Sequence, residues 1–280
     1  MRSKLALGTA QLGLDYGVAN TRGRPSDAEV DRLLTAAFAE HDVRAIDTAP
    51  AYGDAEARLG AWFAANGRPE GVTLVTKVGA VGERFDPGEV RRGIEASCAK
   101  LGSAPDVLLL HDVADLFRHG GALLDVVTEY VETVGVSVYE PDEIVRARSF
   151  ERVGAIQYPF NVFDRRVRSA GSLDGMKTFA RSALLQGLFV APPGRVEDAD
   201  RWVSALSRLA DGYGLKVIDL AIAYASEASR AEYVLVGVET SAQLAGVAEA
   251  MSQPLELRRL DEIEMSFADV DVSIVDPRRW

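Results

Sequence analysis

Four residues that could carry out acid–base chemistry each lie at or just beyond the end of a short apolar segment. They are Asp47 and Tyr52 in RAIDTAPAYG, Lys77 in VTLVTKVG and His111 in DVLLLHD. A tyrosine alone is a poor acid near neutral pH, because its unperturbed pKa is about 10. A lysine ammonium beside it favours the phenolate, and an aspartate keeps that lysine charged and in place. With a neutral histidine to orient a carbonyl oxygen, this set predicts a site that protonates a carbonyl as hydride reaches it.

The segments that position these residues alternate with amphipathic helices, which is typical of a parallel sheet covered by helices. Eight such strands, apolar almost throughout, predict a closed (β/α)₈ TIM barrel with both faces of its sheet covered. The expected strands are 5–10, 44–47, 72–77, 106–111, 134–139, 153–158, 177–184 and 232–237. Two of the expected helices begin at Ser26 and at Asp86, and the last is capped by Thr240 and Gln243. The other expected helices span about 54–65, 122–131, 141–148 and 217–228.

The chain is predicted to form a single domain over residues 1–280, because single α/β barrels reach about 250 residues and no linker or repeat interrupts this one. Residues 185–215 are an extra segment after strand seven, with a Pro-Pro-Gly loop and then an amphipathic helix. Cys98 is the only cysteine, which excludes an internal disulfide. We interpret it as a small buried residue of the helix that begins at Asp86.

The composition excludes several classes of partner. The net charge is −11 with the acidic residues scattered, whereas nucleic acids and anionic membranes require a basic patch. No apolar run approaches the ~20 residues of a membrane span. The start, MRSKLALGTAQLGL, is interrupted by Gly8, Thr9 and Gln11 and reads as a first strand, not a signal peptide. We expect a cytoplasmic protein that is a monomer or a weak homo-oligomer and acts on a small molecule.

In a barrel of this kind, functional side chains gather at the carboxyl ends of the strands. Asp47, Lys77 and His111 end three consecutive strands, and Tyr52 lies in the loop after the first of them. We therefore expect all four to meet at one mouth. A buried lysine is costly unless it is paired, so Asp47 and Lys77 are the expected ion pair.

Several segments resemble the aldo/keto reductase superfamily in order, spacing and content, over roughly residues 5–250. They are IDTAPAYG, TKVG, LLLHD, GVSV, IQYPFN, RSALLQGLF and VLVGVETSAQL. The resemblance implies a (β/α)₈ barrel that interconverts an aldehyde, ketone or sugar and its alcohol with a nicotinamide cofactor. That cofactor is usually NADPH, bound without a glycine-rich loop, and the chain has no strand-linked GxGxxG. The start GTAQLGLDYGVAN is similar to a bacterial branch associated with sugars or secondary metabolites.

The resemblance also implies a role for each matched residue. Tyr52 would be the general acid, Lys77 would favour its ionisation, and Asp47 would orient Lys77. His111 would donate a hydrogen bond to the substrate oxygen. Ser137 and Gln157 match residues that bind the nicotinamide carboxamide, and Gly8 and Thr9 match the floor beneath the ring. The remaining cofactor positions are Arg181, Ser182, Leu184 and Gln186 after strand seven, and Gly237, Glu239, Thr240 and Gln243 after strand eight.

Two departures from the family pattern bear on specificity. Arg181 stands where many relatives stack a tyrosine on the nicotinamide; its plane can also stack, and its charge suits an acidic substrate or a cofactor phosphate. Val138 replaces an amide that many relatives use to bind the carboxamide. The strand-eight motif has no cation for a 2′-phosphate. The family pattern favours NADP(H), this missing cation favours NAD(H), and both are retained.

Other interpretations stay open beside the enzyme. A regulatory or scaffold protein could keep the cofactor site without useful catalysis, although the complete set of four residues favours an enzyme. A metal-dependent hydrolase is disfavoured and no metal site is expected, because the chain has three histidines and no HxH pair after strand one. Arg165 and Arg166 follow strand six, and we interpret them as a solvated pair, with a phosphate contact as the alternative.

Overall fold

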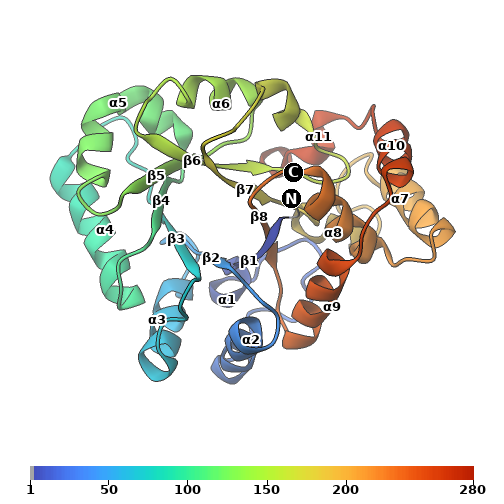
Figure 1. Cartoon of the computed structure of the whole chain (residues 1–280), viewed down its shortest axis with the longest axis horizontal. Coiled ribbons are helices and arrows are strands. Elements are labelled where there is room, and N and C mark those ends of the chain that lie inside the picture. Colours follow the sequence, from blue (N-terminus) through green and yellow to red (C-terminus); the bar gives the residue numbers. More distant parts are fainter. Residues whose placement is uncertain (1–2) are drawn as a thin grey trace.

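The computed structural model describes residues 3–280 and shows a closed barrel of eight parallel strands. Each strand pairs with the next along the chain, and the last pairs with the first, so the predicted fold class is confirmed. Helices surround the strands, with α3–α5 on one side and α7–α10 on the other (Figure 1). The strands are β1 (Lys4–Gly8), β2 (Ala45–Asp47), β3 (Thr73–Val78), β4 (Val107–Leu110), β5 (Thr133–Ser137), β6 (Val153–Pro159), β7 (Lys177–Arg181) and β8 (Tyr233–Gly237).

The helices follow the expected alternation, and two of them begin with the capping boxes that the sequence predicts. Ser26 and Glu29 cap α2, and Thr240 and Gln243 cap α9, each pair exchanging side-chain and backbone hydrogen bonds. The barrel helices are α1 (Ala10–Gly13), α2 (Asp27–Ala39), α3 (Ala55–Asn66), α4 (Pro87–Leu101), α5 (Val113–Val127), α6 (Pro141–Ala147), α7 (Asp200–Gly212), α8 (Val217–Ala228) and α9 (Ser241–Ser252). The extra helical segments are η1 (Arg166–Ala170), η2 (Leu185–Val190), α10 (Leu257–Ser266), α11 (Val272–Val275) and η3 (Pro277–Arg279).

Some sequence expectations were wrong in detail. The helix expected at 122–131 starts earlier, at Val113, where the Asp112 side chain caps it. Gly120 (φ 51°) divides this helix into two parts, and the sequence pattern indicated only the second. β7 ends at Arg181, three residues earlier than expected, because Ser182 takes a left-handed conformation (φ 61°). Cys98 is only half-buried on α4, where Ser97 takes the buried position.

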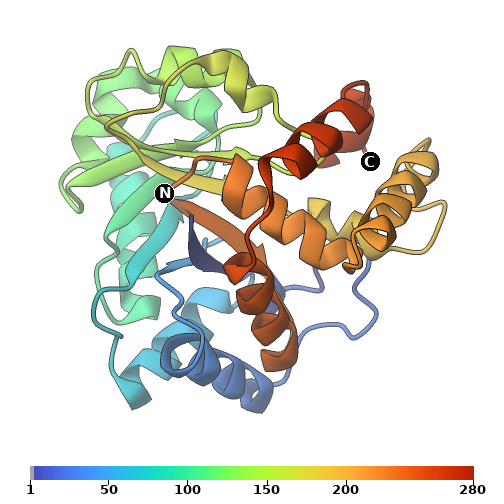
Figure 2. The same ribbon diagram turned by 45° about the vertical axis from the view of Figure 1, so that its right-hand side comes forward.

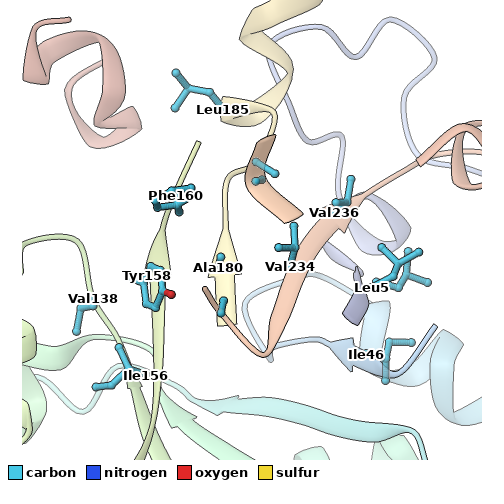
Figure 3. Packing of buried hydrophobic residues seen from close by; sticks show 14 of the residues in the cluster. Leu5, Ile46, Val138, Ile156, Tyr158, Phe160, Ala180, Leu185, Val234 and Val236 are labelled. Carbon is cyan, nitrogen blue, oxygen red and sulfur yellow. The ribbon is translucent and has the colours of Figure 1, made fainter. Parts of the chain in front are cut away.

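Hydrophobic side chains form two layers, one inside the barrel and one between the strands and the helices. Successive strand residues point to opposite faces, so alternate positions supply each layer. The outer layer includes Ile156, Tyr158 and Ala180 of adjacent strands, with Val234 and Val236 of β8 (Figure 3). The inner layer consists of Ala6, Ala45, Val75, Val107, Leu109, Ala155, Phe179, Tyr233 and Leu235.

The base of the barrel interior is closed by aromatic rings. Phe179 and Tyr233 stack with their ring centroids 5.1 Å apart, and the Tyr233 hydroxyl lies 3.2 Å from Thr73 Oγ1. The ammonium of Lys4 lies over the Tyr233 ring at 5.4 Å. Within residues 3–280, this end of the barrel interior is therefore filled by packed side chains.

Two residues beyond the inner layer, toward the carboxyl end of each strand, the inward-facing residues are no longer apolar. We call this set the top row; it faces the barrel axis at the carboxyl ends of the strands. Gly135, two residues before Ser137, also faces inward, because a Cβ there would lie 2.7 Å from Leu109. The two-residue period of each strand therefore leads from the packed base to one residue of this row at the mouth of the barrel. The top row is Gly8, Asp47, Lys77, His111, Ser137, Gln157, Arg181 and Gly237.

Candidate active site

Asp47 and Lys77 form a buried ion pair in the top row. Lys77 Nζ lies 2.6 Å from Asp47 Oδ1 and donates a second hydrogen bond to the Thr48 carbonyl at 2.9 Å. Asp47 is 3% exposed and Lys77 is 2% exposed. Burial alone would lower the pKa of Lys77, but the charge and hydrogen bonds of Asp47 and Tyr52 outweigh it and raise that pKa. The lysine is therefore held as an ammonium, as expected.

Tyr52 lies beside this ion pair, and His111 lies beside Tyr52. The ammonium of Lys77 is 4.8 Å from the centre of the Tyr52 ring. The Tyr52 and His111 rings meet edge to face, with centroids 6.1 Å apart and an interplanar angle of 86°. Burial lowers the pKa of His111, and the positive charge of Lys77 lowers it further. The structure thus brings together all four residues that the sequence singles out, with a neutral imidazole next to the phenol.

Gln157 extends the set on the other side of Asp47. Its Nε2 donates to Asp47 Oδ2 at 2.8 Å, and the Thr9 hydroxyl and backbone N–H each donate to the Asp47 carbonyl at 3.0 Å. Gln157 and Thr9 were expected to contact the cofactor; in the structure both hold Asp47 in place. Because Nε2 binds a carboxylate, Gln157 presents Oε1, which has no hydrogen-bond partner among residues 3–280.

Arg181, on the opposite side of the row, is held differently. Its Nη2 donates to the Val138 carbonyl at 2.9 Å, its Nη1 lies 3.3 Å from Ser182 Oγ, and its guanidinium lies 4.1 Å from the ring centre of Tyr139. Arg278, from the carboxyl-terminal η3, lies over the same ring at 3.8 Å. Arg181 therefore spans from β7 to the loop after β5.

Comparison with known proteins adds a family to this geometry. Residues 4–266 match the model of the aldo/keto reductase family. The chain belongs to the aldo/keto reductase family.

Individual relatives agree with this assignment. The chain is 30% identical over 167 residues to the aldo-keto reductase str7 of Strobilurus tenacellus, which covers 56% of this chain and about half (48%) of that protein. Its fold is similar to that of a glycerol dehydrogenase from Gluconobacter oxydans, with a TM-score of 0.72 over 99% of this chain and 94% of the other. Sequence identity to that structure is 21%, so the likeness concerns the fold.

Tyr16 is a half-buried residue near this site that the sequence did not single out. Burial raises its pKa to about 12; Tyr52 and Tyr139 act in the same direction, whereas Arg181 opposes them. Tyr16 is thus close to several site residues and stays a neutral phenol. Its place in the loop after strand one, on the same face of the barrel as Tyr52, is the signal that could have identified it.

The loop after β7 contains the expected cofactor residues Ser182, Leu184 and Gln186 in a strained conformation. Ser182, Leu185 and Gln186 all have φ between 47° and 61°, a left-handed conformation that residues with side chains rarely adopt. The loop is supported by the segment between α1 and α2, because Val18 N donates to the Gln186 carbonyl at 2.9 Å. Figure 2 shows the corresponding segment between α1 and α2 running beside the residues that precede α7.

The residues after β8 that were expected to bind the cofactor form hydrogen bonds with neighbouring residues of the chain. Gln243 Oε1 accepts hydrogen bonds from the backbone N–H groups of Glu239 and Thr240, at 2.7 and 3.1 Å. The Gln11 amide lies where a Cβ on Gly237 would be, so a larger residue at position 237 would have to displace the Gln11 side chain. At Gly8 a Cβ would meet only ordinary contacts. The side chains of Thr240 and Gln243 therefore shape the start of α9.

Arg165 and Arg166 are neither a solvated pair nor free to bind phosphate. Arg165 donates to the carbonyl groups of Glu264 and Phe267, which fastens the end of α10 to the loop after β6. Arg166 pairs with Asp164 and Glu140 at 3.0 and 2.7 Å. Across residues 3–280, no helix is long and apolar enough to cross a membrane, and no group of three metal-binding side chains occurs.

Proposed function

We propose that this chain is an oxidoreductase that interconverts a carbonyl compound and its alcohol with a nicotinamide cofactor. The observation that carries the proposal is the contact of Tyr52 with both Lys77 and His111 at the mouth of the barrel. A phenol beside a fixed ammonium can give up and regain a proton, and a neutral imidazole beside it can donate a hydrogen bond to the same oxygen. Family membership supports this chemistry.

The donors and acceptors in the top row fit the carboxamide of a nicotinamide. Ser137 and Gln157 are register partners on β5 and β6, and within the described residues neither the Ser137 hydroxyl nor Gln157 Oε1 has a hydrogen-bond partner. A carboxamide has one carbonyl acceptor and one NH₂ donor, which match a hydroxyl and an amide oxygen. The loop Ser182–Gln186 and the start of α9 would hold the phosphates and the adenosine.

When bound, a reduced nicotinamide supplies hydride to the carbonyl carbon. Tyr52 then donates its hydroxyl proton to the carbonyl oxygen, and in the reverse direction it accepts the proton of the alcohol. Lys77 stabilises the resulting phenolate, and Asp47 keeps Lys77 charged and correctly placed. His111 orients the carbonyl oxygen toward Tyr52. Because the pKa of His111 is lowered, its ring stays neutral and does not compete as an acid.

The loop after β8 bears on the choice between NADP(H), which the family pattern favours, and NAD(H). This loop offers Glu239, Thr240 and Gln243 but no lysine or arginine for a 2′-phosphate. We propose that NAD(H) serves as well as NADP(H). Fluorescence titration with NADH and NADPH tests this, and a strong preference for NADPH would contradict it.

The experiment that tests the function is Tyr52→Phe, assayed by nicotinamide absorbance against a panel of aldehydes, ketones and sugars. Turnover should be lost while cofactor affinity is nearly unchanged, because only the transferable proton is removed. Tyr130→Phe is the matched control, because the Tyr130 hydroxyl contacts Glu95 on the surface. Activity retained in Tyr52→Phe would contradict the proposed role. Cofactor binding without turnover in the wild type would favour the regulatory or scaffold alternative.

A further inference from the structure

The top row contains one positive charge that no carboxylate neutralises. Arg181 is the last residue of β7, two positions beyond the interior residue Phe179, so its side chain starts from the same inward row as Lys77. Lys77 is paired with Asp47 at 2.6 Å. Among residues 3–280, Arg181 forms no ion pair and bonds only to Val138 O and Ser182 Oγ.

Arg278 shows what a purely structural arginine looks like at the same place. Both guanidinium groups lie over the Tyr139 ring, at 4.1 and 3.8 Å. Arg278 is neutralised by Asp276 at 2.7 Å and Glu140 at 3.2 Å. Arg181 has the same aromatic contact without either carboxylate, so its charge remains available to a ligand.

The guanidinium also keeps unused hydrogen-bond donors. An arginine has five N–H donors, of which Arg181 uses one toward Val138 and one toward Ser182. A half-buried cation that lacks partners is stabilised when an anion completes its hydrogen bonds. The charge of Arg181 also reaches the reactive end of the site, because it contributes to lowering the pKa of His111.

We propose, on the basis of the function proposed above, that Arg181 binds an oxyanion of the substrate, so that carboxylate-bearing carbonyl compounds and the matching hydroxy acids are preferred over neutral ones. The planar fork of a guanidinium matches a carboxylate through two parallel hydrogen bonds. The carbonyl group then lies at Tyr52 and His111 while the acid group lies at β7. A cofactor phosphate has the same chemistry, and the tests below distinguish the two sources.

Binding provides a test that does not depend on turnover. Calorimetry should show that the wild-type protein, with oxidised cofactor present, binds succinate on the order of tenfold or more tighter than succinamide, as expected for a charged hydrogen-bond pair. Arg181→Met should abolish this preference, and Arg181→Lys should restore part of it. Arg146→Met is the control, because Arg146 lies over Phe117 at 4.0 Å outside the site. Equal affinities in the wild type, or a preference retained in Arg181→Met, would overturn the inference.

Turnover separates this inference from the proposed function. The ratio of kcat/KM for succinic semialdehyde over butanal should exceed about ten in the wild type and approach one in Arg181→Met, while Arg278→Met keeps the wild-type ratio. Reduction of both aldehydes with equal efficiency would overturn the inference and leave the proposed function intact. Arg181-dependent succinate binding without turnover of any carbonyl compound would support the anion site and overturn the proposed function.

Cofactor binding by the same variant tests whether Arg181 contacts a cofactor phosphate instead of the substrate. Arg181→Met should leave the dissociation constants of NADH and NADPH unchanged. Weaker binding of NADPH alone would assign Arg181 to the 2′-phosphate, and weaker binding of both would assign it to the pyrophosphate or to stacking on the nicotinamide. Either result would overturn the substrate assignment.

Discussion

The two ends of the barrel interior are built from the same strands and behave in opposite ways. At the base, Phe179 and Tyr233 stack in an apolar layer in which every group is packed. At the mouth, at the next inward-facing position of β2 and β3, Asp47 and Lys77 carry buried charges that are stable only as a pair. Substitutions at the base should therefore change stability alone, whereas substitutions at the mouth should change both stability and chemistry.

The largest effect should come from breaking the ion pair at the mouth. Lys77→Met leaves Asp47 buried and unpaired, which should cost about 3–5 kcal/mol of unfolding free energy. Turnover should also be lost, because Tyr52 loses its ammonium neighbour. Urea unfolding and steady-state kinetics measure the two losses.

A double variant separates these losses. Lys77→Met with Asp47→Asn should regain most of the stability, because Gln157 can still donate to an amide oxygen, yet it should remain inactive. If the single variant were as stable as the wild type, the ion pair would not constrain the site in the way that its burial indicates.

At the base, Tyr233→Ala should cost about 3–5 kcal/mol through the cavity it leaves, with kcat unchanged in the molecules that remain folded. Tyr233→Phe keeps the ring, loses only the contact with Thr73, and should cost about 0.5–1.5 kcal/mol. Denaturant unfolding measures both variants. A change in kcat or in cofactor affinity would show that the base and the mouth are coupled. It would contradict the expectation that substitutions at the base change stability alone.

The smallest effect is the pH dependence of stability from His111. A histidine in the unfolded chain titrates near pH 6.5, whereas burial and Lys77 hold the pKa of His111 below its usual value in the folded protein. Its contribution to stability is therefore complete above pH 6.5 and is lost as the pH falls, because only the unfolded chain takes up the proton. The stability difference between the wild type and His111→Gln should decrease from pH 8 to pH 5.

His41 and His119 are the other histidines, are present in both proteins, and cancel in this comparison. A difference that stays constant or grows as the pH falls would mean that the imidazole of His111 is no harder to protonate in the folded protein than in the unfolded chain.

The sequence predicted the barrel and the grouping of Tyr52 with Asp47, Lys77 and His111, because both depend on local patterns. Strand periodicity places Asp47 and Lys77 on the same face, and the strand ends bring His111 to them. The partners of Arg181 and the position of Tyr16 could not be predicted, because they depend on loops from distant parts of the chain that meet only after the barrel closes. The carboxyl-terminal helices were missed for a similar reason, since α10 is fixed by Arg165, about 100 residues earlier in the chain.

The strict alternation along each strand limits how this protein can change during evolution. A single residue inserted or deleted at the start of β7 would shift the strand by one position and turn both Phe179 and Arg181 away from the interior. Point substitutions at strand ends, and length changes confined to the connecting loops, leave that frame intact. New substrate preferences can therefore arise by exchanging one residue at the end of a strand while the rest of the barrel is inherited unaltered.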